Sequence, residues 1–139
     1  MNSANQKLAA HLATGIKGED LAQKFLLKLG YTILAKNWRH SHLELDLICR
    51  HSDQIVFVEV KTRNSSKCGG PLAGVTKAKQ TRLIRAACFW LSQHNCWNMP
   101  CSFDIISVII HSDSFSLEHI PNAFEAGNFM DCSNTAWQF

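Results

Sequence analysis

The last part of this 139-residue chain lacks lysine and arginine. Residues 86–139 contain five acids and no lysine or arginine, whereas residues 36–85 hold ten of the fourteen lysines and arginines against four acids, a local charge of +6. A polyanion is therefore expected to bind along the middle of the chain. The alternative is that the cluster Lys77, Lys79, Arg82 and Arg85 forms an ordinary solvated helix face.

Long apolar runs are missing as well. No stretch approaches the roughly 18 consecutive apolar residues that span a bilayer, and the N-terminus lacks a basic start followed by an apolar segment. We therefore expect no membrane association, no secretory signal and a cytoplasmic location.

The six cysteines include no C-x-x-C pair. Because a reducing compartment is expected, free thiols are favoured over disulfides. His94, Cys96 and Cys101 are soft metal ligands, but their spacing matches no usual zinc pattern. A zinc site is therefore the weaker alternative.

The composition, 46% hydrophobic and 18% charged, is that of a folded globular protein rather than a disordered chain. The length predicts one domain over residues 1–139. Residues 1–13 have weak periodicity and are predicted to be an N-terminal extension. Residues 112–139 are predicted to be a C-terminal tail of uncertain order.

Hydrophobic periodicity and capping signals predict alternating helices and strands. Gly30 is a good C-terminal cap and Thr76 a good N-cap. The predicted elements are a helix at 17–29, a strand from 31 leading into 37–39, hairpin strands at 43–50 and 54–62, a polar loop at 64–74, a helix at 76–93 and a covered strand at 103–110.

The two hairpin strands carry the acids. The strand at 43–50 has one apolar side, because leucine or cysteine occupies every second position. The strand at 54–62 is apolar on both faces until Glu59, like a central strand. If the loop between them has an even number of residues, Asp46 lies directly opposite Glu59. Directly opposed residues hold their Cβ atoms roughly 4.5–5.5 Å apart, close enough for two carboxylates to share one cation.

A solvated hairpin face with cross-strand ion pairs is the ordinary explanation of alternating charges. Two facts favour a functional site instead. Ile48 and Phe57 share the charged face, so the acids lie where burial is costly without a positive partner. Asp46 and Glu59 would also repel each other, and a bound divalent metal would offset that repulsion.

Asp46 followed by Glu59-Val60-Lys61 resembles the PD-(D/E)xK nuclease signature, in which an acid on one strand precedes acid-x-Lys on the next. Further motifs recur in the same order in the YraN-like family of bacterial predicted endonucleases. These motifs are Gly18-Glu19-Asp20-Leu21-Ala22, Gly30-Tyr31, Asn37-Trp38-Arg39, Glu44-Leu45-Asp46-Leu47-Ile48, Phe57-Val58-Glu59-Val60-Lys61-Thr62-Arg63, Lys79-Gln80 and Phe103-Asp104.

The resemblance covers roughly residues 15–125. It implies an α/β, restriction-endonuclease-like αβα core, with a central mixed sheet flanked by helices, and a role on nucleic acid. The sequence departs from the family at two places. Leu43 stands where a glycine usually precedes the Glu-x-Asp element, which bears on the backbone leading into the site, and Ala73-Gly74 replaces a more usual acid-alanine pair.

The candidate catalytic centre follows from the register and the resemblance. Asp46 and Glu59, with the backbone carbonyl of Val60, would hold Mg²⁺ or Mn²⁺ through hard oxygens. Lys61 shares a face with Glu59 and would orient the metal-bound water or offset charge in the transition state. By the same register, Glu44 would be the cross-strand partner that keeps Lys61 in place.

The resemblance adds Glu19, as an auxiliary metal ligand or base, to the candidate catalytic residues. The alternative role of a glutamate at this position is a favourable helix-dipole partner. His40 and His42 flank the site and are interpreted as peripheral, because hard carboxylates dominate. Gln80 would bond a phosphate or a water, or cap its helix. The candidate nucleic-acid-binding residues are Arg39, Arg63, Lys79, Gln80 and Arg82.

The sequence therefore predicts a divalent-metal-dependent phosphodiesterase, endonuclease-like, that acts on DNA or structured nucleic acid. The alternative is a non-catalytic nucleic-acid-binding module that retains the nuclease fold. A homo-oligomer, or a protein partner bound through the apolar and acidic C-terminal tail, also remains open.

Overall fold

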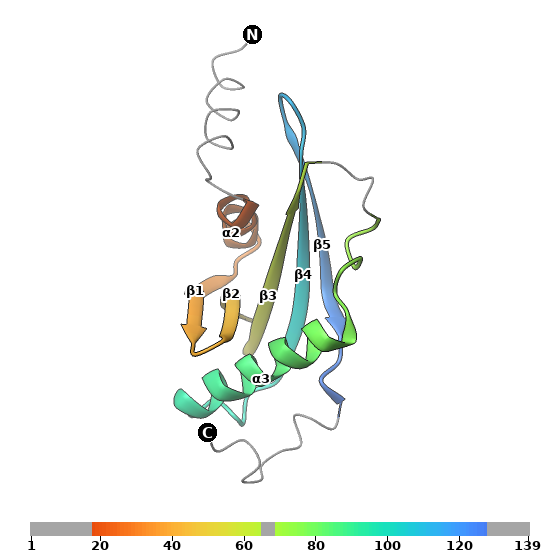
Figure 1. The fold of residues 1–139 in the computed structure, drawn as a ribbon. Coiled ribbons are helices and arrows are strands. Elements are labelled where there is room, and N and C mark those ends of the chain that lie inside the picture. Colours follow the sequence, from red (N-terminus) through yellow and green to blue (C-terminus); the bar gives the residue numbers. More distant parts are fainter. Residues whose placement is uncertain (1–17, 65–68, 128–139) are drawn as a thin grey trace.

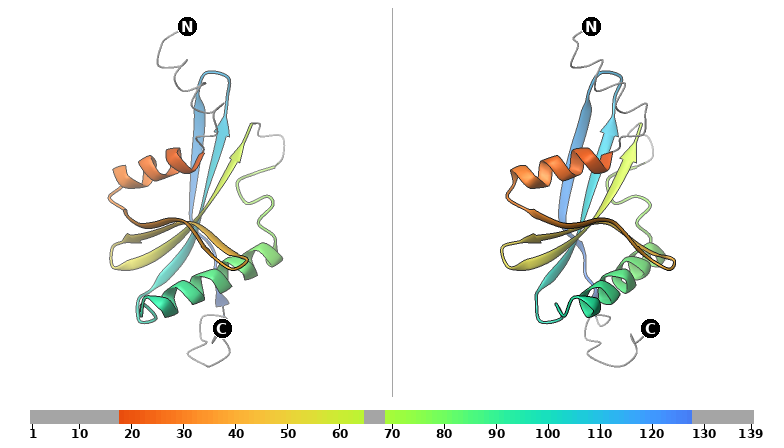
Figure 2. Two further views of the ribbon diagram at one scale, coloured as in Figure 1. Left: turned by 60° about the vertical axis from the view of Figure 1, so that its left-hand side comes forward. Right: turned by 90° about the vertical axis from the view of Figure 1, so that its left-hand side faces the viewer.

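The computed structural model describes residues 18–64 and 69–127 as a five-stranded mixed sheet with a helix on each face (Figures 1 and 2). The strands are adjacent in chain order, and only β3 and β4 run parallel. This αβα arrangement confirms the predicted fold class and is consistent with a restriction-endonuclease-like core. The elements are α2 (Gly18–Lys28), β1 (Thr32–His40), β2 (Leu43–His51), β3 (Gln54–Arg63), α3 (Lys77–Gln93), β4 (Cys101–Ile110) and β5 (Phe115–Phe124).

Strand β3 is buried on both faces, as predicted. Phe57 packs in the core under α3, where it meets Trp90 edge to face, whereas Val56 and Val58 pack in the core under α2. A continuous apolar run is what a central strand covered by two helix layers requires. The sheet therefore separates two cores, and residues with odd numbers in β3 face α3.

The hairpin between β2 and β3 has the two-residue loop that the register prediction required. Ser52 and Asp53 have φ values of 48° and 62°, as a type I′ turn demands at both central positions. The resulting register pairs Ile48 with Phe57 and Leu47 with Val58. The paired ladder ends there, so Asp46 and Glu59 are the first residues beyond it, where the two strands separate.

The apolar side predicted for the strand at 43–50 is divided between the two cores, which corrects the prediction of one continuous side. Leu45 packs under α3, whereas Leu47 packs under α2. Between them, Asp46 lies opposite Asn37 of β1, which has a φ of 50°. The apolar side chains of β2 therefore change from one face of the sheet to the other between Leu45 and Leu47, on either side of Asp46.

The element boundaries follow the local signals. Helix α2 is followed by Gly30, with φ of 88°, and Thr76 caps α3 by accepting a hydrogen bond from the Lys79 amide. The strand expected from residue 31 is longer than predicted and reaches His40. The C-terminal tail of uncertain order contains β5. The predictions for residues 1–13 and for the end of that tail lie outside the described residues.

Within the two described ranges, no helix is long and apolar enough to cross a membrane.

Candidate active site

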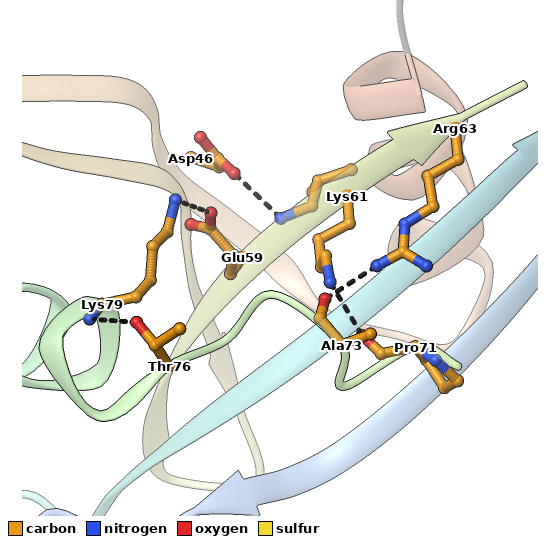
Figure 3. A network of polar contacts seen from close by, with 9 residues as sticks. Asp46, Glu59, Lys61, Arg63, Pro71, Ala73, Thr76 and Lys79 are labelled. Atoms are coloured by element: carbon orange, nitrogen blue, oxygen red, sulfur yellow. Dashed lines mark hydrogen bonds and ion pairs between the residues drawn. The ribbon is translucent and has the colours of Figure 1, made fainter. Parts of the chain in front are cut away.

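Asp46 and Glu59 meet where β2 and β3 separate, on the face that α3 covers (Figure 3). The Asp46 carboxylate accepts a 2.9 Å hydrogen bond from the backbone amide of Val60. Because the β2–β3 ladder ends at Val58, the Val60 amide has no carbonyl of β2 to bond and instead bonds the side chain of Asp46. The bond ties the acid on β2 to the Glu-x-Lys element on β3.

Glu59 is held in an environment that disfavours its charge. Burial, and then the nearby Asp46 carboxylate, raise the pKa of Glu59 from 4.5 to about 7, and a hydrogen bond between the two carboxyls adds to the rise. Lys79 of α3 opposes it through an ion pair with Nζ 2.9 Å from Glu59 Oε1. The like-charge pair expected from the register is thus present, and Lys79 supplies a positive partner.

A pocket of about 180 Å³ opens over the two carboxylates. It brings together two predicted metal ligands, Asp46 and Glu59, and two predicted phosphate-binding residues, Lys79 and Arg82. It also includes His42, predicted to be peripheral, and Glu44, predicted to be the partner of Lys61. The lining residues are His42, Leu43, Glu44, Asp46, Glu59, Lys79, Arg82 and Leu83.

The donor set suits a hard divalent ion better than zinc. Among the described residues, no group of three or more histidine, cysteine, aspartate and glutamate side chains is close enough together to hold a metal. Mg²⁺ usually takes one or two carboxylates and completes its shell with water and substrate phosphates, whereas structural zinc needs four protein ligands. Asp46 and Glu59 therefore fit Mg²⁺ or Mn²⁺, and the zinc alternative at His94, Cys96 and Cys101 gains no support.

Lys61 lies on the same face as Glu59 but points toward the 69–74 turn (Figure 3). Its ammonium donates a long hydrogen bond, 3.5 Å, to the carbonyl of Pro71. Burial, followed by Arg63 and Lys79, lowers the pKa of Lys61, and Glu59 opposes the shift. The β2–β3 ladder ends at Leu47 and Val58, and Lys61 turns to Pro71, so the predicted role of Glu44 as the partner of Lys61 is wrong. The two strands separate before that pair would form. Glu44 pairs across strands with Arg39 of β1.

Arg63 of β3 binds the backbone of the 69–74 turn. Its guanidinium donates hydrogen bonds to the carbonyls of Gly69 at 2.9 Å, Gly70 at 3.2 Å and Ala73 at 2.7 Å. Gln80 continues this connection, because its side-chain amide donates to the carbonyl of Val75 at 3.2 Å. These two predicted nucleic-acid contacts therefore hold the chain that leads from the turn into α3.

Glu19 lies in the first turn of α2, on the opposite face of the sheet from α3, and is not among the residues that line the pocket. The first residue of α2 nevertheless packs closely against β3. A Cβ on Gly18 would overlap the Thr62 side chain and lie 3.1 Å from Val108 Cβ. Gly18 thus places Glu19 close to the segment of β3 that carries Lys61.

A second polar cluster, under α2, was not predicted from the sequence. Asp104 is 2% exposed and accepts hydrogen bonds from the Asn122 amide at 2.9 Å and from Ser102 at 3.3 Å. Its other oxygen lies 2.7 Å from Nε2 of His119. An acid inside the apolar run of residues 103–110 was the available signal. Asp104 holds β5 where the β4–β5 register shifts.

Comparison with known proteins gives a consistent family. The profile described as "Uncharacterised protein family UPF0102" matches residues 18–108, from α2 into β4. A UPF0102 protein of Nitratidesulfovibrio vulgaris (strain DP4) is 44% identical over 129 residues, covering 93% of this chain and 96% of the relative. A UPF0102 protein of Lawsonia intracellularis is 40% identical over 124 residues, covering 89% and 94%.

A UPF0102 protein of Chlorobium chlorochromatii (strain CaD3) is 45% identical over an alignment of 118 residues that covers 79% of this chain and 89% of the relative. The matches extend over most of both chains and include the hairpin and α3. The chain therefore belongs to the UPF0102 family, the YraN-like family whose motifs its sequence carries.

Proposed function

We propose that the protein is a metal-dependent phosphodiesterase that cleaves DNA or structured nucleic acid in the cytoplasm. The observation that supports this most directly is the Asp46–Glu59 pair. Two half-buried carboxylates share a pocket with Lys79 and Arg82, and the pKa of Glu59 is raised to about 7 by burial and by Asp46. Ionisable groups with such shifted pKa values are concentrated at functional sites.

Each charged residue has a distinct role in this proposal. Asp46 and Glu59, with the carbonyl of Val60, hold Mg²⁺ or Mn²⁺, which would supply Lewis acidity toward a scissile phosphate. Lys61 offsets negative charge in the transition state after leaving its long bond to Pro71. Arg39 and Arg82 bind flanking phosphates without reading sequence.

The remaining predicted site residues support the centre from outside the pocket. Glu19 is retained as an auxiliary metal ligand or base at the start of α2. Arg63 and Gln80 position the turn and the first residues of α3 through their backbone hydrogen bonds. Their substitution is expected to weaken cleavage by moving Lys61 and Lys79, not by removing a phosphate contact.

A paired assay of cleavage and binding tests the proposal. Plasmid nicking with Mn²⁺ and gel shift are measured for wild type, Asp46→Asn and Lys61→Ala. Loss of one preorganised charge typically costs about 100-fold or more in rate, so both variants should lose at least that much cleavage. Lys61→Ala should keep its affinity within a few-fold, because its charge acts mainly in the transition state.

Arg50→Gln is the control, because Arg50 pairs with Asp53 at the far end of β2. Its nicking rate should match wild type. An unchanged rate in Lys61→Ala would remove that residue from the mechanism. Tight binding by wild type, with no cleavage of duplex, flap or junction substrates under Mg²⁺ or Mn²⁺, would instead favour the non-catalytic binding module.

A further inference from the structure

Lys79 is a basic residue of the pocket that forms an ion pair with one of the two carboxylates. It lies in the first turn of α3, where its amide is fixed by the Thr76 hydroxyl at 3.1 Å. From there its side chain reaches to the sheet, and Nζ lies 2.9 Å from Glu59 Oε1 (Figure 3). Charge-assisted hydrogen bonds of this length are about twice as strong as neutral ones. The helix start and the central acid are therefore joined by one ion pair.

This ion pair conflicts with a divalent cation at the same acid. One oxygen of Asp46 is already engaged by the Val60 amide, so a cation shared by the two carboxylates draws on the oxygens of Glu59. The ammonium of Lys79 sits on one of them. Two positive groups cannot share that oxygen without strong repulsion. A cation at Glu59 would therefore lie close to the Lys79 ammonium, and its charge favours displacement of Lys79.

We propose that Lys79 is an internal counter-ion that takes the place of the divalent cation at Glu59 and is released when the cation binds. The released ammonium then becomes a phosphate ligand. This second step rests on the proposed function, whereas the exchange at Glu59 depends only on cation binding.

The fold provides a place for the released side chain. The Lys79 side chain is 39% exposed while that of Glu59 is 12% exposed, so the lysine is the partner that can swing into solvent. Arg82 is three residues further along α3 and lines the same pocket. Residues spaced by three lie on one helix face. After the exchange, Lys79 and Arg82 would present two positive charges toward one phosphate.

Calorimetric titration with Ca²⁺ tests the exchange without requiring catalysis. Wild type, Lys79→Met and Lys77→Met are compared at pH 8.5, above the raised pKa of Glu59. Lys77 is the matched control, because it is an exposed lysine of the same helix turn that does not line the pocket. Lys79→Met should bind Ca²⁺ roughly tenfold more tightly, since a charged hydrogen bond no longer has to be broken. Lys77→Met should stay within about twofold, the scale of a surface charge.

Amine labelling of wild type, read by mass spectrometry, gives a second measure. Acetylation of Lys79 should increase when Ca²⁺ is added, whereas acetylation of Lys77 should not change. This arm does not depend on the folding of any variant. Lys79→Gln serves as a second neutral variant, and circular dichroism checks that both variants fold.

The outcomes separate this inference from the proposed function. Equal Ca²⁺ affinity of wild type and both Lys79 variants, with no change in Lys79 labelling, would overturn the counter-ion exchange and leave the metal site intact. No Ca²⁺ binding by any variant would overturn both. Tighter binding by the Lys79 variants together with Ca²⁺-dependent labelling of Lys79 would establish the exchange, whether or not nucleic acid is cleaved.

Discussion

Glu59 is the residue whose charge should control the stability of the site. Its pKa is about 7 in the folded protein, against an ordinary value of 4.5. The folded state therefore binds this proton more tightly than the unfolded state. The stabilisation is fully present below about pH 4.5 and is lost as pH rises toward 7. In the absence of metal, wild type should lose on the order of 1–3 kcal/mol over this window relative to Glu59→Gln.

Melting temperatures from pH 4 to pH 8 measure this difference. At about 3 °C per kcal/mol for a domain of this size, the curves of wild type and Glu59→Gln should diverge by several degrees as pH rises. Glu118→Gln is the control, because Glu118 is an exposed acid on β5. A wild-type curve parallel to that of Glu59→Gln would mean that Glu59 titrates normally and that its burial has no electrostatic consequence.

At the scale of single elements, α2 can pack closely against β3 because Gly18 has no side chain. Gly18→Ala would place a methyl group against Thr62 and 3.1 Å from Val108 Cβ. Overpacking of this kind typically costs about 1–3 kcal/mol. The variant should therefore unfold at lower urea concentration, with an unchanged m-value.

Gly70→Ala is the matched comparison for this substitution. A Cβ at Gly70 meets nothing within 4 Å, and this glycine has no left-handed φ. Loss of unfolded-state entropy alone should leave Gly70→Ala neutral or slightly more stable. Equal effects of the two substitutions would show that the contact between α2 and Thr62 does not limit stability.

The elements that could be predicted are those with local signals. Thr76 and Gly30 mark helix ends through their own side chain or φ, and the Ser52-Asp53 turn sets the register that brings Asp46 to Glu59. Strand β5 escaped prediction because Pro121 interrupts its pattern and half of its residues are exposed. Its pairing with β4 depends on contacts made by Asp104, which no local pattern encodes.

The site residues likewise fall into those that local patterns place and those whose partners depend on the tertiary fold. The two carboxylates and Lys61 belong to one hairpin, so turn length and alternation place them. The partners of Lys79 and Arg63 depend instead on how the 69–74 turn carries the chain from β3 to α3. Neither charge nor spacing specifies that path. Sequence reasoning therefore assigned both side chains to phosphate, whereas each has an intramolecular partner.

Across the whole molecule, the basic and acidic segments of the sequence form opposite sides of the sheet. The strands follow one another in chain order, so the basic segment 36–85 forms β1, β2, β3 and the start of α3. The acidic segment 86–139 supplies β4 and β5 at the other side. A polyanion should therefore lie over β1–β3 and α3, where the pocket opens.

Salt dependence of nucleic-acid binding tests this placement. Removing one side chain that binds a phosphate should reduce the slope of log affinity against log salt concentration by about 0.9 for duplex DNA. Arg39→Gln and Arg82→Gln, measured by fluorescence anisotropy over a series of salt concentrations, should each weaken binding and flatten the slope by about that amount. Both residues belong to the basic side, and Arg82 lines the pocket.

Arg50→Gln separates a local phosphate interaction from a change in net charge. Arg50 carries the same charge, but it lies at the far end of β2 and pairs with Asp53 at 3.4 Å. Its substitution should leave the slope unchanged, because no phosphate is released from it. If all three substitutions flatten the slope equally, the polyanion senses only net charge, and the pocket face has no preferred role in binding. A flatter slope confined to the Arg39 and Arg82 variants would instead place the phosphate backbone across the face that carries Asp46 and Glu59.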